Sequence, residues 1–167
     1  MVSTRPGPIV VMGVSAAGKS MIGSGIADRL GVRFVDGDDL HPPTNVAKMT
    51  AGEPLTDDDR EPWLDAIAAL LGEASAGVVV ACSALRASYR SRLRAGAGRP
   101  IRFVHLEVAE AELQRRIAAR TDHFMPPSLL ADQLATLEWP GDEPDVVVID
   151  AGHRIDEVVA GATAALS

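Results

Sequence analysis

The chain has 167 residues, 47% hydrophobic and 23% charged, a composition typical of one globular domain and not of a disordered or fibrous protein. Its net charge of −7 argues against a general binder of nucleic acid or membrane, because such proteins need a basic surface to gather phosphates. The one cysteine, Cys82, fits a reducing compartment, and with no membrane-length apolar run and no signal-peptide pattern in residues 1–8 we expect a cytoplasmic protein.

Strand-like and helix-like segments alternate along the whole chain. The expected strands are short apolar runs at residues 9–12, 33–36, 78–82, 101–106 and 146–149. The expected helices occupy residues 21–30, 42–51, 56–76, 85–95, 110–120, 126–137 and 155–166. This order predicts an α/β fold with one domain over residues 1–167, in which helices cover both faces of a five-stranded parallel sheet. Ligands of such sheets bind at the carboxyl ends of the strands.

A phosphate-binding loop is expected at residues 13–20, which read GxxxxGKS between the first strand and the first helix. Glycines let the backbone N–H groups converge on phosphate oxygens, and the helix dipole adds positive potential. Lys19 would reach the outer phosphates as a catalytic residue, and the Ser20 hydroxyl would bind Mg²⁺. The residues expected to contact the nucleotide are Gly13, Ser15, Ala16, Ala17, Gly18, Lys19, Ser20 and Met21.

Two carboxylates follow the second expected strand, Asp36 and Asp38, with Gly37 between them as a flexible link. Phosphoryl transfer to an alcohol needs a group that orients the hydroxyl and takes its proton, and a carboxylate near the metal. We assign Asp38 to the acceptor hydroxyl and Asp36 to the metal. The reverse assignment and a plain Asx turn are the alternatives.

Arg116 and Arg120 are four residues apart on the expected helix 110–120 and would share a face. A proline-broken segment follows them, so we expect a lid over about residues 116–138. In small P-loop kinases, lid arginines neutralise charge on the transferring phosphoryl group, and we assign both residues to that catalytic role. The alternative is a solvated basic face, on which Arg115 is expected in either case.

Further cations lie near the expected strand ends, at Lys48, Arg60 and Arg86. Arginine can grip a carboxylate with two parallel hydrogen bonds, so this set favours a negatively charged acceptor. His41, three residues after Asp38, could hydrogen-bond a polyol.

The remaining histidines, and the cysteine, show no metal-ligand spacing. His105 and Cys82 lie in apolar strands and are expected to be structural, as is Trp63 on its helix, whereas His123 falls in the expected lid.

Three classes of P-loop protein could carry this loop. A GTPase is excluded, because neither lysine lies in a guanine-reading Asn-Lys-x-Asp or Thr-Lys-x-Asp motif. A non-catalytic ATP-binding module fits the loop but gives no reason for the aspartate pair and the cations at one sheet edge. A small-molecule kinase accounts for all of them.

Several blocks resemble the signature of bacterial gluconokinases over about residues 9–150. They are residues 36–42 (DGDDLHP), Asn45, 48–49, 52–55, 57–60, 62–64, 81–85, 89–90, 93–94, 123–125 and several positions in 129–138. The resemblance implies an adenylate-kinase-like fold, a homodimer, and ATP-dependent phosphorylation of D-gluconate at its terminal hydroxyl to give 6-phosphogluconate.

On this resemblance, the acceptor would lie with its hydroxyl at Asp38, its polyol at His41 and Ser83, and its carboxylate at the cations Arg60, Arg86 and Lys48. Two segments depart from the family pattern. Residues 15–17 read Ser-Ala-Ala where many relatives have Ser-Gly-Ser, and Asp122 stands where glycine is usual.

Overall fold

The computed structural model describes residues 6–120 and 127–167, built around a five-stranded, all-parallel sheet of order β2-β3-β1-β4-β5. The strands are β1 (Ile9–Met12), β2 (Arg33–Asp36), β3 (Val78–Ala81), β4 (Arg102–Glu107) and β5 (Val146–Asp150). The five parallel strands that the apolar runs predict are therefore confirmed. Register places Asp36 beside Ala81 and Met12 beside His105, so the carboxyl ends meet at one edge.

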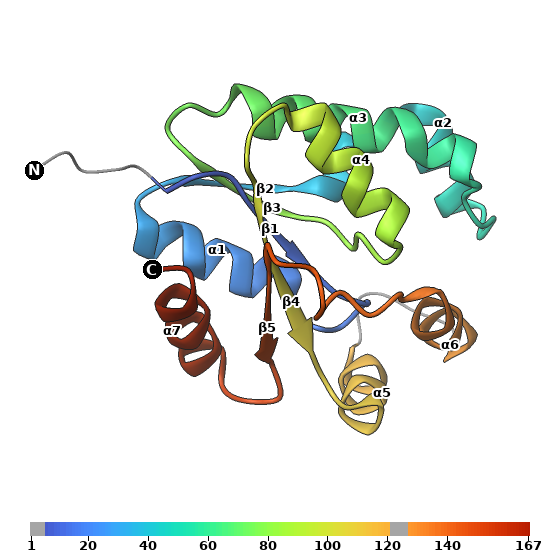
Figure 1. The fold of residues 1–167 in the computed structure, drawn as a ribbon. Coiled ribbons are helices and arrows are strands. Elements are labelled where there is room, and N and C mark those ends of the chain that lie inside the picture. Colours follow the sequence, from blue (N-terminus) through green and yellow to red (C-terminus); the bar gives the residue numbers. More distant parts are fainter. Residues whose placement is uncertain (1–5, 121–126) are drawn as a thin grey trace, which may run out of the picture.

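Helices cover both faces of this sheet (Figure 1). They are α1 (Lys19–Leu30), α2 (Pro43–Thr50), α3 (Asp57–Glu73), α4 (Ala87–Ala97), α5 (Glu110–Ala119), α6 (Pro127–Thr136) and α7 (Ile155–Ala165), with a 3₁₀ helix η1 (Gly37–Leu40). Helices α1 and α7 pack on one face, α3 and α4 on the other, and each pair encloses its own hydrophobic cluster. Helices α5 and α6 lie beyond the carboxyl end of β4 (Figure 1).

The central strands are apolar because both of their faces are covered. All residues of β1 and β3 are at most 3% exposed, whereas the edge strands β2 and β5 are half-buried. Continuous valine-rich runs are typical of parallel strands of this kind. Cys82 and His105 belong to this buried set, and Trp63 is also buried, as the sequence predicts.

Some boundaries differ from the sequence prediction. Helix α1 begins at Lys19 and not at Met21, because the phosphate loop leads directly into its first turn. Helix α4 begins at Ala87 rather than at residue 85, since Arg86 has an extended backbone. Helix α5 ends at Ala119, so the prediction that Arg120 shares a helix face with Arg116 is wrong; Arg120 is the extended cap residue.

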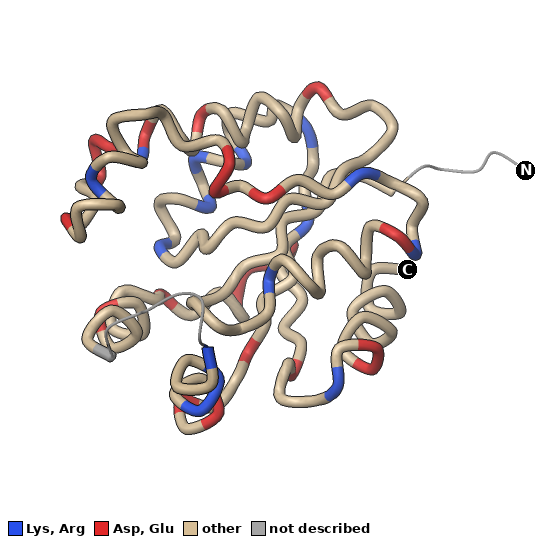
Figure 2. The backbone as a smooth tube through the Cα atoms, turned by 180° about the vertical axis from the view of Figure 1, so that it is seen from behind, with Lys and Arg blue, Asp and Glu red and all other residues tan. Residues whose placement is uncertain are grey.

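Acidic and basic residues are interspersed along the backbone (Figure 2). On helix α5, Glu112 pairs with both Arg115 and Arg116, and the Arg115 side chain is 77% exposed, as predicted for a surface residue. Within the described residues, helices long and apolar enough to cross a membrane are absent.

Candidate active site

The phosphate loop joins β1 to α1 and contacts the neighbouring strand β4 and the segment after β3. The Gly13 N–H donates to the Ser83 carbonyl across 3.3 Å, and a Cβ on Gly13 would lie only 3.1 Å from the Leu106 carbonyl oxygen. Gly13 also has a φ of 150°, a backbone conformation that favours glycine, and the added Cβ would be in tighter contact than is usual. Ser83, a predicted substrate residue, is thus in contact with the loop through its main chain.

Lys19 is the first residue of α1, and its ammonium folds back over the loop. Its Nζ donates to the carbonyl oxygens of Gly13 (3.0 Å) and Val14 (3.1 Å). Burial lowers the pKa of Lys19, and the carboxylates of Asp38 and Asp36 oppose that shift. A cation held by neutral carbonyls in a partly dehydrated loop interacts strongly with phosphate charge.

Ala16 occupies the tip of the loop with a φ of 69°, in the left-handed region that favours glycine. Its carbonyl accepts a 3.0 Å hydrogen bond from Arg116 Nη1, whose Nη2 donates to the Ala151 carbonyl at 2.9 Å. Arg116 therefore ties the loop tip to the segment after β5. Its predicted role on the transferring phosphoryl group stays a prediction.

The other predicted catalytic arginine, Arg120, is exposed, and its charge contributes to lowering the pKa of Lys19. Arg120 is therefore near enough to Lys19 for the two charges to interact. The predicted lid residues His123, Phe124 and Met125, and Asp122 before them, lie outside the described residues.

Helix α6 reaches the phosphate loop through Gln133, whose Oε1 accepts the Ser15 N–H at 2.7 Å. Sequence reasoning gave Gln133 no role, since only its place in the family pattern marked it. Of the other predicted nucleotide contacts, Ala17 is buried and Met21 is 63% exposed.

Ser20 and Asp36, the two predicted metal residues, are in direct contact. Ser20 Oγ donates to Asp36 Oδ2 at 2.9 Å, which places a hydroxyl and a carboxylate oxygen together beside the loop. Hard oxygen donors of this kind suit Mg²⁺, which takes few protein ligands when phosphates and waters supply the rest. The residues present therefore fit a magnesium ion.

Asp36 also begins η1, because its Oδ1 accepts the Asp38 N–H at 3.0 Å as a helix cap. The expected flexible link at Gly37 is wrong: Gly37 is buried, and a Cβ there would collide with the Ala81 carbonyl oxygen. Glycine serves close packing of η1 on β3. The backbone at Asp38 is thereby held in place.

Asp38 is an exposed residue of η1, and the surrounding protein removes only part of the water from its carboxylate. Partial burial raises the pKa of Asp38, the negative charge of Asp36 raises it further, and Lys19 opposes the rise. A carboxylate with a raised pKa is a stronger base, as the acceptance of a hydroxyl proton requires.

His41 follows η1 and stacks on Trp63, with ring centroids 4.2 Å apart and planes 13° from parallel. The Trp63 indole N–H donates to the Gly37 carbonyl at 2.7 Å. The predicted core residue Trp63 is therefore also the support on which His41 and η1 rest.

The predicted carboxylate-binding arginines surround Tyr89. The guanidinium carbons of Arg60 and Arg86 lie 5.7 and 6.0 Å from the Tyr89 ring centroid, within cation–π range. The Tyr89 hydroxyl donates to the Asp57 carboxylate at 2.6 Å. The Nη1 atoms of Arg60 and Arg86 lie 3.9 and 4.0 Å from the oxygens of the same carboxylate, so both ion pairs are long. Two cations around one carboxylate leave a net positive charge here.

Lys48, the third predicted cation, forms a 2.7 Å ion pair with Asp59 on α3. The same Asp59 completes a capping box with Thr56, and these contacts lower its pKa to about 2. In this structure Lys48 ties α2 to the start of α3, apart from the pair of arginines.

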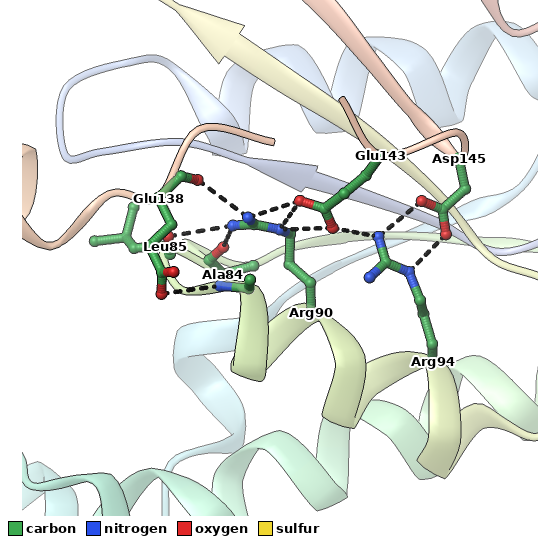
Figure 3. A network of polar contacts seen from close by, with 8 residues as sticks. Ala84, Leu85, Arg90, Arg94, Glu138, Glu143 and Asp145 are labelled. Atoms are coloured by element: carbon green, nitrogen blue, oxygen red, sulfur yellow. Dashed lines mark hydrogen bonds and ion pairs between the residues drawn. The ribbon is translucent and has the colours of Figure 1, made fainter. Parts of the chain in front are cut away.

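A buried arginine network joins the loop after β3 to the segment that enters β5 (Figure 3). Arg90 is fully buried; it donates to the carbonyls of Ala84, Leu85 and Glu138 and to the Glu143 carboxylate. Arg94 pairs with Glu143 and Asp145. Sequence reasoning missed this structural role, because a basic residue on a helix is usually solvated.

The comparisons with known proteins agree with this geometry. A family model described as an AAA domain matches residues 9–140. The gluconokinase of Gluconobacter oxydans is 50% identical over 158 residues, covering 93% of this chain and 88% of its own length. The chain belongs to the gluconokinase family. The thermoresistant gluconokinase of Escherichia coli is 42% identical, covering 90% of this chain and 88% of its own length.

Solved structures support the same family. A gluconokinase from Sinorhizobium meliloti superposes with a TM-score of 0.90 at 51% identity, covering 97% of this chain and 92% of that one. An APS kinase from Mycobacterium tuberculosis reaches a TM-score of 0.66 at 21% identity, covering 98% of both chains, which shows a shared fold alone. The predicted resemblance and the P-loop kinase fold are thereby confirmed.

Proposed function

We propose that this protein transfers the terminal phosphoryl group of ATP to the terminal hydroxyl of D-gluconate, giving 6-phospho-D-gluconate and ADP. The observation that carries the proposal is the contact of Ser20 with Asp36, which joins the phosphate loop of Lys19 to the segment of Asp38, in a chain 50% identical to a gluconokinase. A base next to a phosphate-binding lysine is what transfer to an alcohol requires.

The loop residues 13–20 bind the phosphates, with Lys19 neutralising the outer ones. Asp38 orients the acceptor hydroxyl and takes its proton. Ser20 and Asp36 would hold Mg²⁺, which supplies positive charge to the phosphate oxygens when bound. Arg116 and Arg120, in the lid at about residues 116–138, neutralise the charge on the transferring phosphoryl group.

The acceptor lies between η1 and the start of α4. His41 and Ser83 bind its hydroxyls, and Arg60 and Arg86 bind its carboxylate with the net positive charge around Tyr89. Lys48, the third predicted cation, contributes little to this site, because the Asp59 carboxylate neutralises its ammonium.

We further propose a cytoplasmic homodimer, a single domain over residues 1–167. The free, buried Cys82 suits a reducing compartment, and the dimer follows from the family resemblance. Light scattering coupled to size exclusion tests the dimer: a mass near twice 17.5 kDa is expected, and a mass equal to one chain contradicts it.

The first experiment measures ADP release with ATP and Mg²⁺ on D-gluconate, related sugar acids, shikimate and AMP, with glucose as the uncharged control. Turnover on gluconate and not on glucose is the expected result. Turnover on AMP or shikimate alone would overturn the acceptor assignment. ATP binding without turnover on any acceptor would instead indicate a non-catalytic nucleotide-binding protein.

A further inference from the structure

Asn45 on α2 is a buried polar residue to which the proposed mechanism assigns no role. It is 1% exposed, and its amide nitrogen Nδ2 lies 2.8 Å from the Asp59 carbonyl oxygen and 3.2 Å from Nδ1 of His41. A carbonyl oxygen only accepts, so the Asp59 contact requires the nitrogen, and not the oxygen, of the amide at this place. The orientation of Asn45 is therefore fixed by the backbone of α3.

The orientation of the amide decides which nitrogen of His41 carries the proton. An amide nitrogen has two N–H groups and no free lone pair, so it donates both to Asp59 and to His41 Nδ1. Nδ1 must then be the unprotonated, accepting nitrogen. In the neutral ring the proton lies on Nε2, on the opposite side of the ring from Asn45.

The surroundings of His41 keep the ring in one place and neutral. Trp63 stacks on one face of the ring, and the charged groups that influence it are Asp38 and Arg60. Burial lowers the pKa of His41, with Arg60 adding to the shift and Asp38 opposing it. The ring therefore offers a single N–H donor between the proposed base and the proposed carboxylate site.

We propose that Asn45 is a positioning residue that locks His41 as the Nε2–H tautomer, so that the ring donates one hydrogen bond to an oxygen of the polyol acceptor. This inference rests on the proposed function for the identity of the acceptor. Because the bond is made to a part of the substrate that does not react, it contributes equally to ground and transition states. Asn45 should consequently govern KM for gluconate and leave kcat nearly unchanged.

The tautomer is measured directly on the unmodified protein. A long-range ¹H–¹⁵N correlation spectrum at pH 7.5, with His41 assigned by its loss in His41→Gln, should show Nδ1 as unprotonated and Nε2 as protonated. A protonated Nδ1, or averaging between the two tautomers, would overturn the proposal. This result does not depend on which acceptor the protein uses.

Asn45→Asp then replaces the donor with an acceptor of nearly the same shape. We expect the proton of His41 to move to Nδ1 and KM for gluconate to rise about tenfold, the effect of one lost hydrogen bond, with kcat within about threefold. Val46→Ala, at a 47% exposed position on the same helix, is the matched control and should change neither.

An Asn45→Asp protein with an unchanged tautomer, or with kcat and KM affected alike, would overturn the positioning role. If the unmodified protein fails to phosphorylate gluconate, the proposed function fails, while the spectrum of His41 still decides the role of Asn45.

Discussion

The phosphate loop and helix α2 hold the only two lysines of the chain, in opposite environments. Lys19 is bonded to main-chain carbonyls and its pKa is lowered by burial, whereas Lys48 is paired with Asp59 and its hydrogen bond raises its pKa. The carbonyls orient Lys19 without cancelling its charge, but Asp59 neutralises Lys48. A lysine in the first setting is available to a phosphate, and a lysine in the second is a tie between two helices.

The largest expected effect follows from removing the loop lysine. Lys19→Ala should reduce kcat by roughly 10³- to 10⁵-fold, the range found for a cation on a transferring phosphoryl group. Steady-state ADP release checks this, with circular dichroism to confirm folding. Turnover within tenfold of the unmodified protein would break the comparison, because Lys19 would then be structural as well.

Removing the proposed base comes next. Asp38→Asn keeps the size of the side chain and its place on η1 but cannot accept a proton, so kcat should fall by roughly 10²- to 10⁴-fold. Asp39→Asn, its exposed neighbour on η1, is the matched control. Near-normal kcat in Asp38→Asn would exclude the residue as general base.

Arg120 tests whether a cation of the lid acts like Lys19. Arg120→Ala should lower kcat by about 10²-fold, and more than it raises KM for ATP, if its charge acts mainly in the transition state. Arg115→Ala, on the exposed side of α5, serves as control. A change confined to KM for ATP would identify Arg120 as a ground-state binding residue.

His105 extends the comparison to a buried base, whose Nδ1 has no hydrogen-bond partner among the described residues. Burial and then the charge of Arg90 lower its pKa to about 4, from an ordinary value of 6.5. Between those values the unfolded chain binds a proton that the folded chain does not, so stability falls as pH falls, by about 3 kcal/mol in full.

Urea unfolding at pH 7 and pH 4.5 measures this loss, and His105→Phe removes the titrating group. The variant should lose less stability over this interval than the unmodified protein. Equal losses in the two proteins would show that carboxylates alone account for the acid sensitivity.

The smallest effect is expected at the paired lysine. Lys48→Met should change KM for gluconate by less than about threefold. The Asp59 carboxylate already neutralises the Lys48 ammonium, which leaves little charge to attract the substrate. Gluconate kinetics beside those of Lys19→Ala make the contrast quantitative. A KM increase comparable to that of Arg86→Ala would show that Lys48 binds the substrate carboxylate. Both lysines would then bind ligands, and the contrast between them would be wrong.

The sequence predicted the parts of the molecule that depend on local pattern. The apolar runs gave the five strands, and the GxxxxGKS motif with Asp36 and Asp38 gave one edge of the sheet. What it could not predict depends on contacts between distant segments. Nothing local says that Asp59 will pair with Lys48, or that Arg116 will bond the Ala16 and Ala151 carbonyls.

The glycine at position 37 shows the same limit. Its place between two aspartates indicates a turn. Glycine is needed, however, because a Cβ would collide with the Ala81 carbonyl of strand β3, a contact that the local sequence does not predict. Likewise, the four-residue spacing predicted that Arg120 lies on the helix with Arg116, but the helix ends at Ala119 and Arg120 has an extended backbone.

The buried guanidinium of Arg90 has a consequence for how the protein opens. It joins α4 to residues 48 and 53 positions away in the chain, and neither side can separate without leaving hydrogen-bonding groups unpaired in the interior. Helix α4 and the approach to β5 therefore form one cooperative unit. Their amide hydrogens should therefore exchange with solvent together, in the slowest opening events of the native protein.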